Sequence, residues 1–79
     1  MSERIKRIMA SVFGVPIASI PDDATINVFP EWDSLRHLEL MLALEKEFGV
    51  RISTNAMLEL LSMRAIEEYL NQRQMAKPE

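Results

Sequence analysis

Apolar residues in the first part of the chain recur at the spacing of one helix face. The residues that share this spacing are Ile5, Ile8, Met9, Val12 and Phe13. Ser2 is suited to cap the start of a helix, and Gly14, followed closely by Pro16, is suited to end it. The pattern therefore predicts an amphipathic helix from Ser2 to about Phe13.

The next segment, residues 14–33, shows no helical periodicity. Pro16, Pro21 and Pro30 interrupt it, and Asp22-Asp23 is typical of a turn. Its apolar residues are scattered: Val15, Ile17, Ile20, Ile26, Val28 and Phe29. We expect these residues to hold a long loop against the core. A loop of this length is unusual in a small fold, and long ordered loops often serve function.

A second helix is predicted between Asp33, a strong N-cap residue, and Phe48-Gly49, where the glycine is a strong stop. Seven apolar residues cover a wide arc of this helix: Leu35, Leu38, Leu40, Met41, Leu42, Leu44 and Phe48. The opposite side carries Arg36, Glu39, Ala43, Lys46 and Glu47. So wide an apolar arc predicts a central helix with several neighbours.

The rest of the chain predicts two further helices. Ser53 or Thr54 can cap a third helix to about Leu61, and Ser62 can cap a fourth. Their expected inward residues are Met57, Leu58 and Leu61 in the third helix, and Ile66, Tyr69 and Leu70 in the fourth. The segment from Val50 to Ile52 is too short to be predicted as a strand. Polar residues from about Asn71 predict a frayed end.

These elements predict an all-α fold, a four-helix bundle with a long first loop and a short third helix. We expect one domain over residues 1–79, with an ordered core at about 2–72 and a polar tail at 73–79. Because the chain has no cysteine, neither a disulfide nor a thiolate metal site can stabilise it. Stability must come from apolar packing between the helices.

Composition and charge exclude several classes of partner. The net charge of −3 argues against nucleic acid. No apolar run is long enough to span a membrane, and the first residues lack the core of a signal peptide. We therefore expect a cytoplasmic monomer.

Few residues could carry chemistry. One histidine and no cysteine leave no zinc site, so we predict no metal. Ser34 is expected at the exposed start of the second helix, where free backbone N–H groups would favour an attached phosphate. Alternatively, Asp33-Ser34 is only a capping pair. A small hydrolase built on Ser34 and His37 is a further alternative, although the sequence offers it no oxyanion hole.

The residues around Ser34 form a longer pattern. Asp33-Ser34-Leu35 is followed by Leu38-Glu39-Leu40 and then by the run LALEKEFGV at residues 42–50. Upstream lie Val15-Pro16 and the run IPDDAT at residues 20–25, and downstream lies IEEYL at residues 66–70. Together these motifs resemble the acyl carrier protein family over nearly the whole chain, to about Leu70.

The resemblance implies a carrier, not an enzyme. It implies that a phosphopantetheinyl transferase moves 4′-phosphopantetheine from coenzyme A onto Ser34, between Asp33 and Leu35. The thiol of this arm would hold acyl groups as thioesters for acyl-loading and acyl-processing enzymes. Because the helical angle turns Ser34 toward the apolar arc, a hydrophobic cargo could fold back near Leu38, Met41 and Ile52.

Partner contacts are expected along the second helix of such a carrier. Our candidates are Glu31, Arg36, Glu39, Leu40, Met41, Glu45 and Glu47. Any one of these charges could instead be ordinary surface charge, and Met41 could belong to the core.

The sequence departs from the family at several positions. Glu31-Trp32 stands where a small residue or glycine is common, and Trp32 either packs against Leu38 or the first loop, or forms part of a partner surface. Three basic residues, Arg36, Lys46 and Arg51, stand where acidic ones are frequent. These basic residues either lie in solvent without functional consequence or alter which partner enzymes bind.

We expect a specialised stand-alone carrier in a lipid, polyketide or secondary-metabolite pathway. Two alternatives remain open: a carrier of aminoacyl or peptidyl groups, and a helical interaction protein that is never modified at Ser34.

Overall fold

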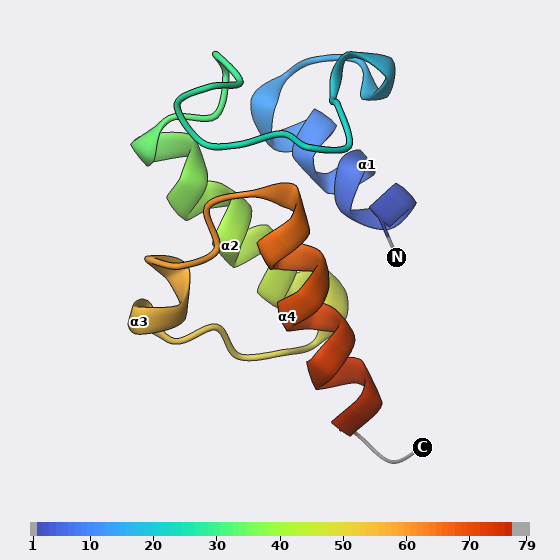
Figure 1. Cartoon of the computed structure of the whole chain (residues 1–79), viewed down its shortest axis with the longest axis vertical. Coiled ribbons are helices and arrows are strands. Elements are labelled where there is room, and N and C mark those ends of the chain that lie inside the picture. The colour runs from blue at the N-terminus through green and yellow to red at the C-terminus, as the bar shows by residue number, and fades with distance from the viewer. Residues whose placement is uncertain (1, 77–79) are drawn as a thin grey trace.

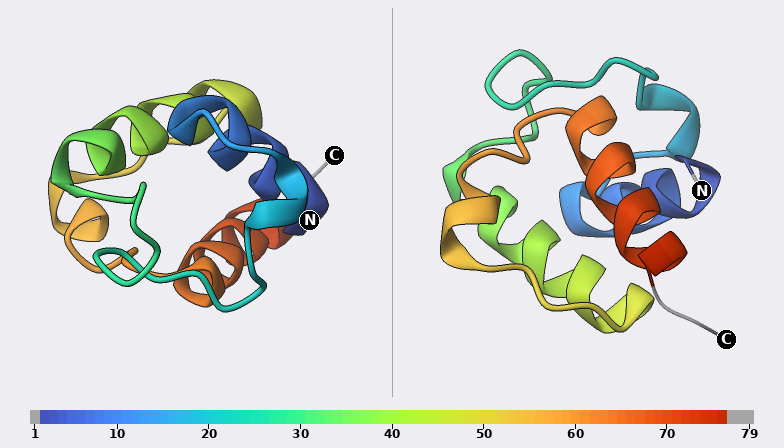
Figure 2. Two further views of the ribbon diagram at one scale, coloured as in Figure 1. Left: turned by 90° about the horizontal axis from the view of Figure 1, so that it is seen from above. Right: turned by 60° about the horizontal axis from the view of Figure 1, so that its bottom comes forward.

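The computed structural model describes residues 2–76, with side chains from 3 to 73, and this part is helical without a strand. Its helices are α1 (Ser2–Phe13), η1 (Ile17–Ser19, a short 3-10 helix), α2 (Ser34–Phe48), α3 (Thr54–Met57) and α4 (Met63–Ala76). The loop between α1 and α2 crosses the end of the bundle where α2 begins (Figures 1 and 2). The predicted all-α bundle with a long first loop and a short third helix is confirmed.

The predicted helix ends form through local hydrogen bonds. Asp33 caps α2, because its carboxylate accepts a hydrogen bond of 2.9 Å from the Arg36 amide. Gly49 ends α2 at φ 65°, a left-handed conformation that a side chain would strain. Ser53 caps α3, and the Ser62 hydroxyl accepts from the Ala65 amide at 3.1 Å as α4 begins. The expected cap at Ser2 concerns a side chain outside the described range.

The core joins residues from every helix except α3 and η1 with residues of the loops. Its buried members are Ile5, Met9, Phe13, Ile20, Ala24, Trp32, Leu40, Met41, Leu44, Phe48, Ile52, Leu60, Met63, Ile66 and Leu70. The neighbours of α2 cover only part of its apolar arc. Leu35, Leu38 and Leu42 are 69%, 52% and 53% exposed. The four residues of α3 are too few to cover this side of α2.

The third helix is shorter than predicted. The helix ends at Met57. Leu58 and Leu61, which were expected to point inward, are exposed, and Leu60 is buried instead. The helical period stops because the chain turns to pair with the first loop: the Leu61 carbonyl accepts from the Ile26 amide at 2.9 Å.

The end of the chain also differs from the prediction of a polar tail from 73 onward. Helix α4 continues to Ala76, and residues 77–79 lie outside the described range. No glycine or proline interrupts residues 71–76, and the Arg73 guanidinium lies 4.6 Å from the centre of the Tyr69 ring one turn earlier.

The first loop is held by backbone pairing as well as by apolar contacts. Thr25 and Ser62 form an isolated antiparallel bridge, and the Met63 amide donates to the Ala24 carbonyl at 2.9 Å. Ile20 and Ala24 are buried, whereas Ile17 and Val28 are exposed, contrary to expectation. Lys6 on α1 donates to the Asp22 carboxylate, and this hydrogen bond raises the pKa of Lys6.

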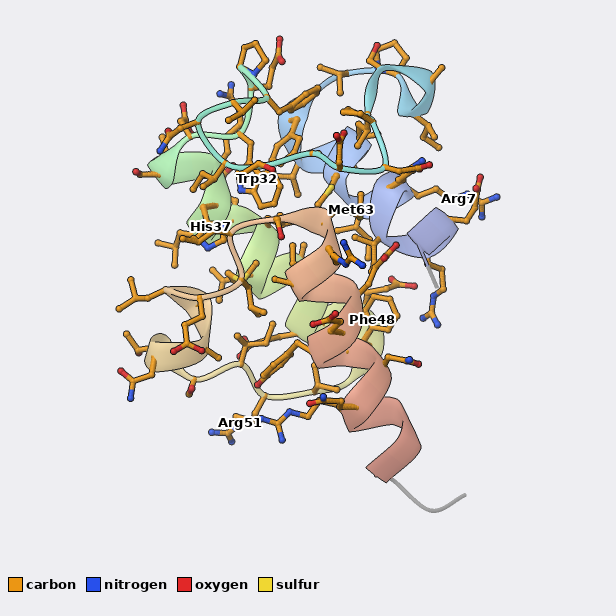
Figure 3. The ribbon with its side chains drawn as sticks, viewed as in Figure 1. Arg7, Trp32, His37, Phe48, Arg51 and Met63 are labelled. Carbon is orange, nitrogen blue, oxygen red and sulfur yellow. The ribbon has the colours of Figure 1, made fainter. Side chains whose placement is uncertain are left out.

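One imidazole connects three segments around the start of α2. The Trp32 indole N–H donates to Nδ1 of His37 at 3.0 Å, and Nε2 of His37 lies 2.8 Å from the Met57 carbonyl oxygen. Because Nδ1 accepts, Nε2 must carry the hydrogen and donate. Figure 3 shows Trp32 and His37 side by side. The neutral His37 ring therefore joins the end of the first loop, α2 and α3.

Replacing His37 by phenylalanine keeps a ring but removes both hydrogen bonds. The buried Trp32 N–H and the Met57 carbonyl then lose their partner, so we expect the free energy of unfolding to fall by about 1–3 kcal/mol. Urea denaturation measures this loss. A cycle with Trp32→Phe tests the bond itself: the second change should cost less once the first is present. Strictly additive losses would contradict the hydrogen bond.

Candidate functional site

Ser34 is an exposed residue at the first position of α2. Two positions earlier Trp32 is fully buried, with ring centres 5.8 Å from Phe13 and 5.9 Å from His37. Between them Asp33 caps the helix. Among the described residues the Ser34 hydroxyl makes no hydrogen bond. A rigid anchor and a cap thus present a free hydroxyl to solvent.

One of the acidic residues next to Ser34 is paired with a cation. The Arg36 guanidinium lies 3.5 Å from the second oxygen of Asp33, and both side chains are about half exposed. Such an exposed pair adds little stability. It does place a positive group beside the capping carboxylate. The predicted contact residues Glu31 and Glu39 are half-buried and exposed, respectively.

A hydrolytic role for Ser34 and His37 finds no support in the geometry. Both ring nitrogens of His37 are engaged, one by Trp32 and one by Met57. The imidazole therefore has no free nitrogen to take a proton from Ser34. Among residues 2–76 no group of acidic or histidine side chains could hold a metal ion, and no helix has the length and apolar character to cross a membrane.

Several leucines of α2 and of the segment after α3 are exposed. Leu35, Leu38 and Leu42 stand three and four residues apart, on one side of α2. Leu58 and Leu61, which follow α3, are exposed as well. The sequence pattern could not reveal this surface, because an apolar arc is equally compatible with burial. The structure gives Ser34 an apolar neighbourhood that water contacts.

Four of the expected partner-contact residues are either buried or bonded to other residues of this chain. Leu40 and Met41 are fully buried, which removes them from the surface. The Glu45 carboxylate accepts from the Ile52 amide at 2.7 Å, and Glu47 pairs with Arg4 at 3.2 Å. Core packing explains Leu40 and Met41, Glu45 holds the loop after α2, and Glu47 links α2 to α1. Glu31, Arg36 and Glu39 remain near Ser34.

The expected path for a folded-back cargo stays a prediction. Two surface grooves of the described part are lined by other residues than Ser34: one lies between α1 and α2, and one lies beside residues 49–54 and α4. Met41 and Ile52 are both packed in the core. A cargo that reached Met41 would have to displace packed side chains, whereas Ile52 lies at the edge of the second groove.

A phosphate ester on the Ser34 oxygen fits the observed position. The hydroxyl is exposed and unbonded, and the first-turn amides of α2 point toward this end of the helix. Only the Arg36 amide among them is satisfied by the cap. The arrangement provides a nucleophilic oxygen in open solvent and a favourable electrostatic setting for one negative group.

Comparison with known proteins agrees with the geometry. Residues 3–70 match the family model described as a phosphopantetheine attachment site. The chain is 31% identical over 71 residues to polyketide-8 synthase acyl carrier protein 2 of Streptomyces avermitilis, covering 90% of this chain and 82% of that protein. It is 28% identical over 74 residues to an acyl carrier protein of Nitratidesulfovibrio vulgaris, covering 94% and 97%. The chain therefore belongs to the acyl carrier protein family, whose cofactor is covalently attached phosphopantetheine.

Proposed function

We propose that Ser34 is the attachment residue and that the chain carries acyl groups between enzymes. The observation that supports this most directly is the exposed, unbonded Ser34 hydroxyl at the capped start of α2. A phosphopantetheinyl transferase would join the Ser34 oxygen to the phosphate of coenzyme A that bears the pantetheine, releasing the nucleotide portion. When bound, the arm supplies a terminal thiol that holds acyl groups as thioesters.

The surrounding residues hold the hydroxyl in place. Trp32 fixes the end of the loop in the core, and Asp33 fixes the first turn of the helix. Neither residue touches the acyl group in this proposal. Both restrict the backbone at Ser34, so that a transferase meets the serine in one position.

Partner enzymes would contact the exposed residues that surround Ser34. Leu35, Leu38 and Leu42 supply apolar area, and Arg36 and Glu39 supply charge at its edge. An apolar centre with a charged rim is the usual composition of a transient interface. This set replaces Leu40 and Met41, which are buried.

We propose that this carrier works in a specialised pathway, on the basis of a named relative and of the charges on α2. One relative is named as a polyketide synthase carrier. The exposed Lys46 and the half-buried Arg36 give α2 positive charges along its length. Opposite charges on a partner would raise its association rate, and like charges would reject it.

Replacing Ser34 by alanine tests the attachment residue. Wild-type protein incubated with coenzyme A and a broad-specificity transferase should gain the mass of one phosphopantetheinyl group, and the alanine variant should gain none. Intact-protein mass spectrometry measures both. Several transferases are needed, each checked on a carrier that it is known to modify. An unmodified wild type would favour the interaction-protein alternative, and a modified alanine variant would place the arm elsewhere.

Two variants of Asp33 distinguish its role as a helix cap from the role of its negative charge in transferase binding. Because asparagine caps about as well as aspartate, Asp33→Asn should keep the free energy of unfolding, while Asp33→Ala should lose about 1 kcal/mol. If the transferase attracts the carboxylate, both variants should be modified several-fold more slowly at low salt. Initial rates by mass spectrometry measure this effect. Wild-type rates for Asp33→Asn would show that the carboxylate acts only as a cap.

A further inference from the structure

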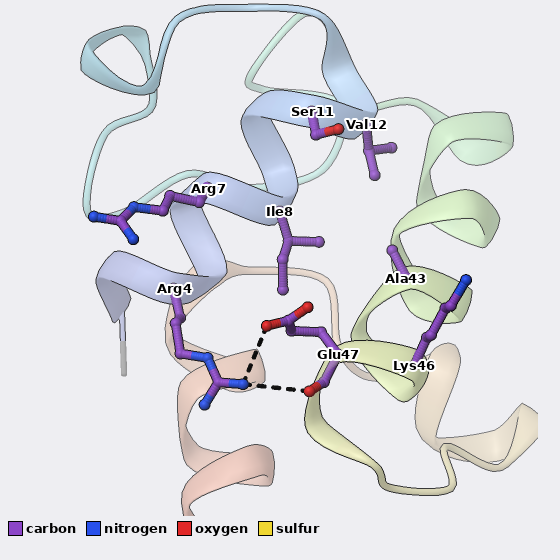
Figure 4. A pocket seen from close by; sticks show the side chains of 8 residues that line it. All are labelled: Arg4, Arg7, Ile8, Ser11, Val12, Ala43, Lys46 and Glu47. Carbon is purple, nitrogen blue, oxygen red and sulfur yellow. Dashed lines mark hydrogen bonds and ion pairs between the residues drawn. The ribbon is translucent and has the colours of Figure 1, made fainter.

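A groove between α1 and α2 combines an apolar floor with charged walls. Its lining residues are Arg4, Arg7, Ile8, Ser11 and Val12 from α1, and Ala43, Lys46 and Glu47 from α2 (Figure 4). Ile8, Val12 and Ala43 are only partly buried, so apolar surface remains open to solvent. In Figure 4 Ile8 extends from α1 into the space beside α2.

The charge of this groove is opposite to that of the chain. Three cationic side chains and one anionic side chain give it a net charge of +2, whereas the whole chain carries −3, so the remaining residues carry −5. An acidic ligand would therefore be attracted here and repelled by much of the remaining surface.

Two of the three cations have no carboxylate partner. Arg4 is occupied: it donates to the Glu47 carboxylate and backbone carbonyl at 3.2 and 3.3 Å, and its guanidinium lies 4.4 Å from the centre of the Phe48 ring. Arg7 and Lys46 form no ion pair with any residue in the described part of the chain, and both are exposed. Figure 4 shows Arg7 at the outer edge of α1 and Lys46 along α2. Each wall thus offers one uncompensated positive charge.

We propose that this groove binds an acidic amphipathic helix of a partner protein. The apolar side of that helix would cover Ile8, Val12 and Ala43, and carboxylates on its flanks would pair with Arg7 and Lys46. Glu47 would not repel the partner strongly, because Arg4 already neutralises it.

The position of the groove separates docking from acyl transfer. Lys46 lies twelve residues after Ser34 along one helix, a rise of about 18 Å at 1.5 Å per residue. A partner helix seated in the groove would leave Ser34, Leu35 and Leu38 free for a catalytic domain. Tethering by a second site raises the effective concentration of that domain near Ser34.

The probe is a synthetic capped peptide of about five helical turns, with leucines along one face and glutamates on the flanks. Titrated into isotopically labelled, unmodified protein, it should shift the amide NMR signals of Ile8, Ser11, Val12, Ala43 and Lys46. Raising the salt concentration should weaken binding. A matched peptide with glutamine in place of glutamate should bind several-fold more weakly.

Charge-reversal variants locate the site. The double variant Arg7→Glu, Lys46→Glu should lower the affinity for the acidic peptide about tenfold or more, because like charges then oppose it. The control is Arg51→Glu, an exposed cation outside this groove, which should change the affinity by less than about twofold. Shifts centred on Leu35 and Leu38, equal effects of the control, or no binding would each overturn the proposal. None of these outcomes depends on modification of Ser34.

Discussion

The burial of Trp32 is the constraint on which the position of Ser34 depends. Its ring is fully enclosed, its N–H is satisfied by His37, and its backbone amide and carbonyl bond to Phe29 and Asn27 at 2.9 Å. A large side chain held in this way fixes the point at which the chain leaves the core, and Asp33 alone separates it from α2. Ser34 therefore begins α2 at a fixed place on the surface.

The His37 ring extends this constraint to α3. A neutral imidazole accepts from the loop and donates to the Met57 carbonyl, so the start of α2 has fixed neighbours on both sides. Toward the other end of α2, the surface between α1 and α2 is a groove with partly buried apolar residues and one ion pair. One helix thus supports a presented hydroxyl at its start and a positively charged groove toward its end.

The starts of α2, α3 and α4 and the end of α2 were predictable from sequence because they depend on neighbouring residues, whereas the ends of α3 and α4 were not. Asp33, Gly49, Ser53 and Ser62 act through hydrogen bonds or backbone angles within a few positions of themselves. The family resemblance was recognisable because it rests on several short motifs of neighbouring residues, spread from Val15 to Leu70. The fold class followed from the spacing of apolar residues in α1, α2 and α4.

Burial on α2 was less predictable because it depends on how much of α2 its neighbours cover. Leu38 and Leu40 have the same side-chain chemistry, yet one is half exposed and the other is fully buried. Pairing of the first loop with Leu61 and Met63 shortens α3, and a short α3 leaves leucines of α2 in solvent. The role of His37 was hidden likewise, because its partner Met57 lies 20 residues away.

The most direct test is to isolate the protein from its own cells and map it by tandem mass spectrometry. Attachment at Ser34 predicts that the peptide containing this residue carries phosphopantetheine, with an acyl group on part of the population. A consistently unmodified Ser34 peptide in cells that use the protein, or an arm found on another residue, would contradict the carrier role assigned to this serine.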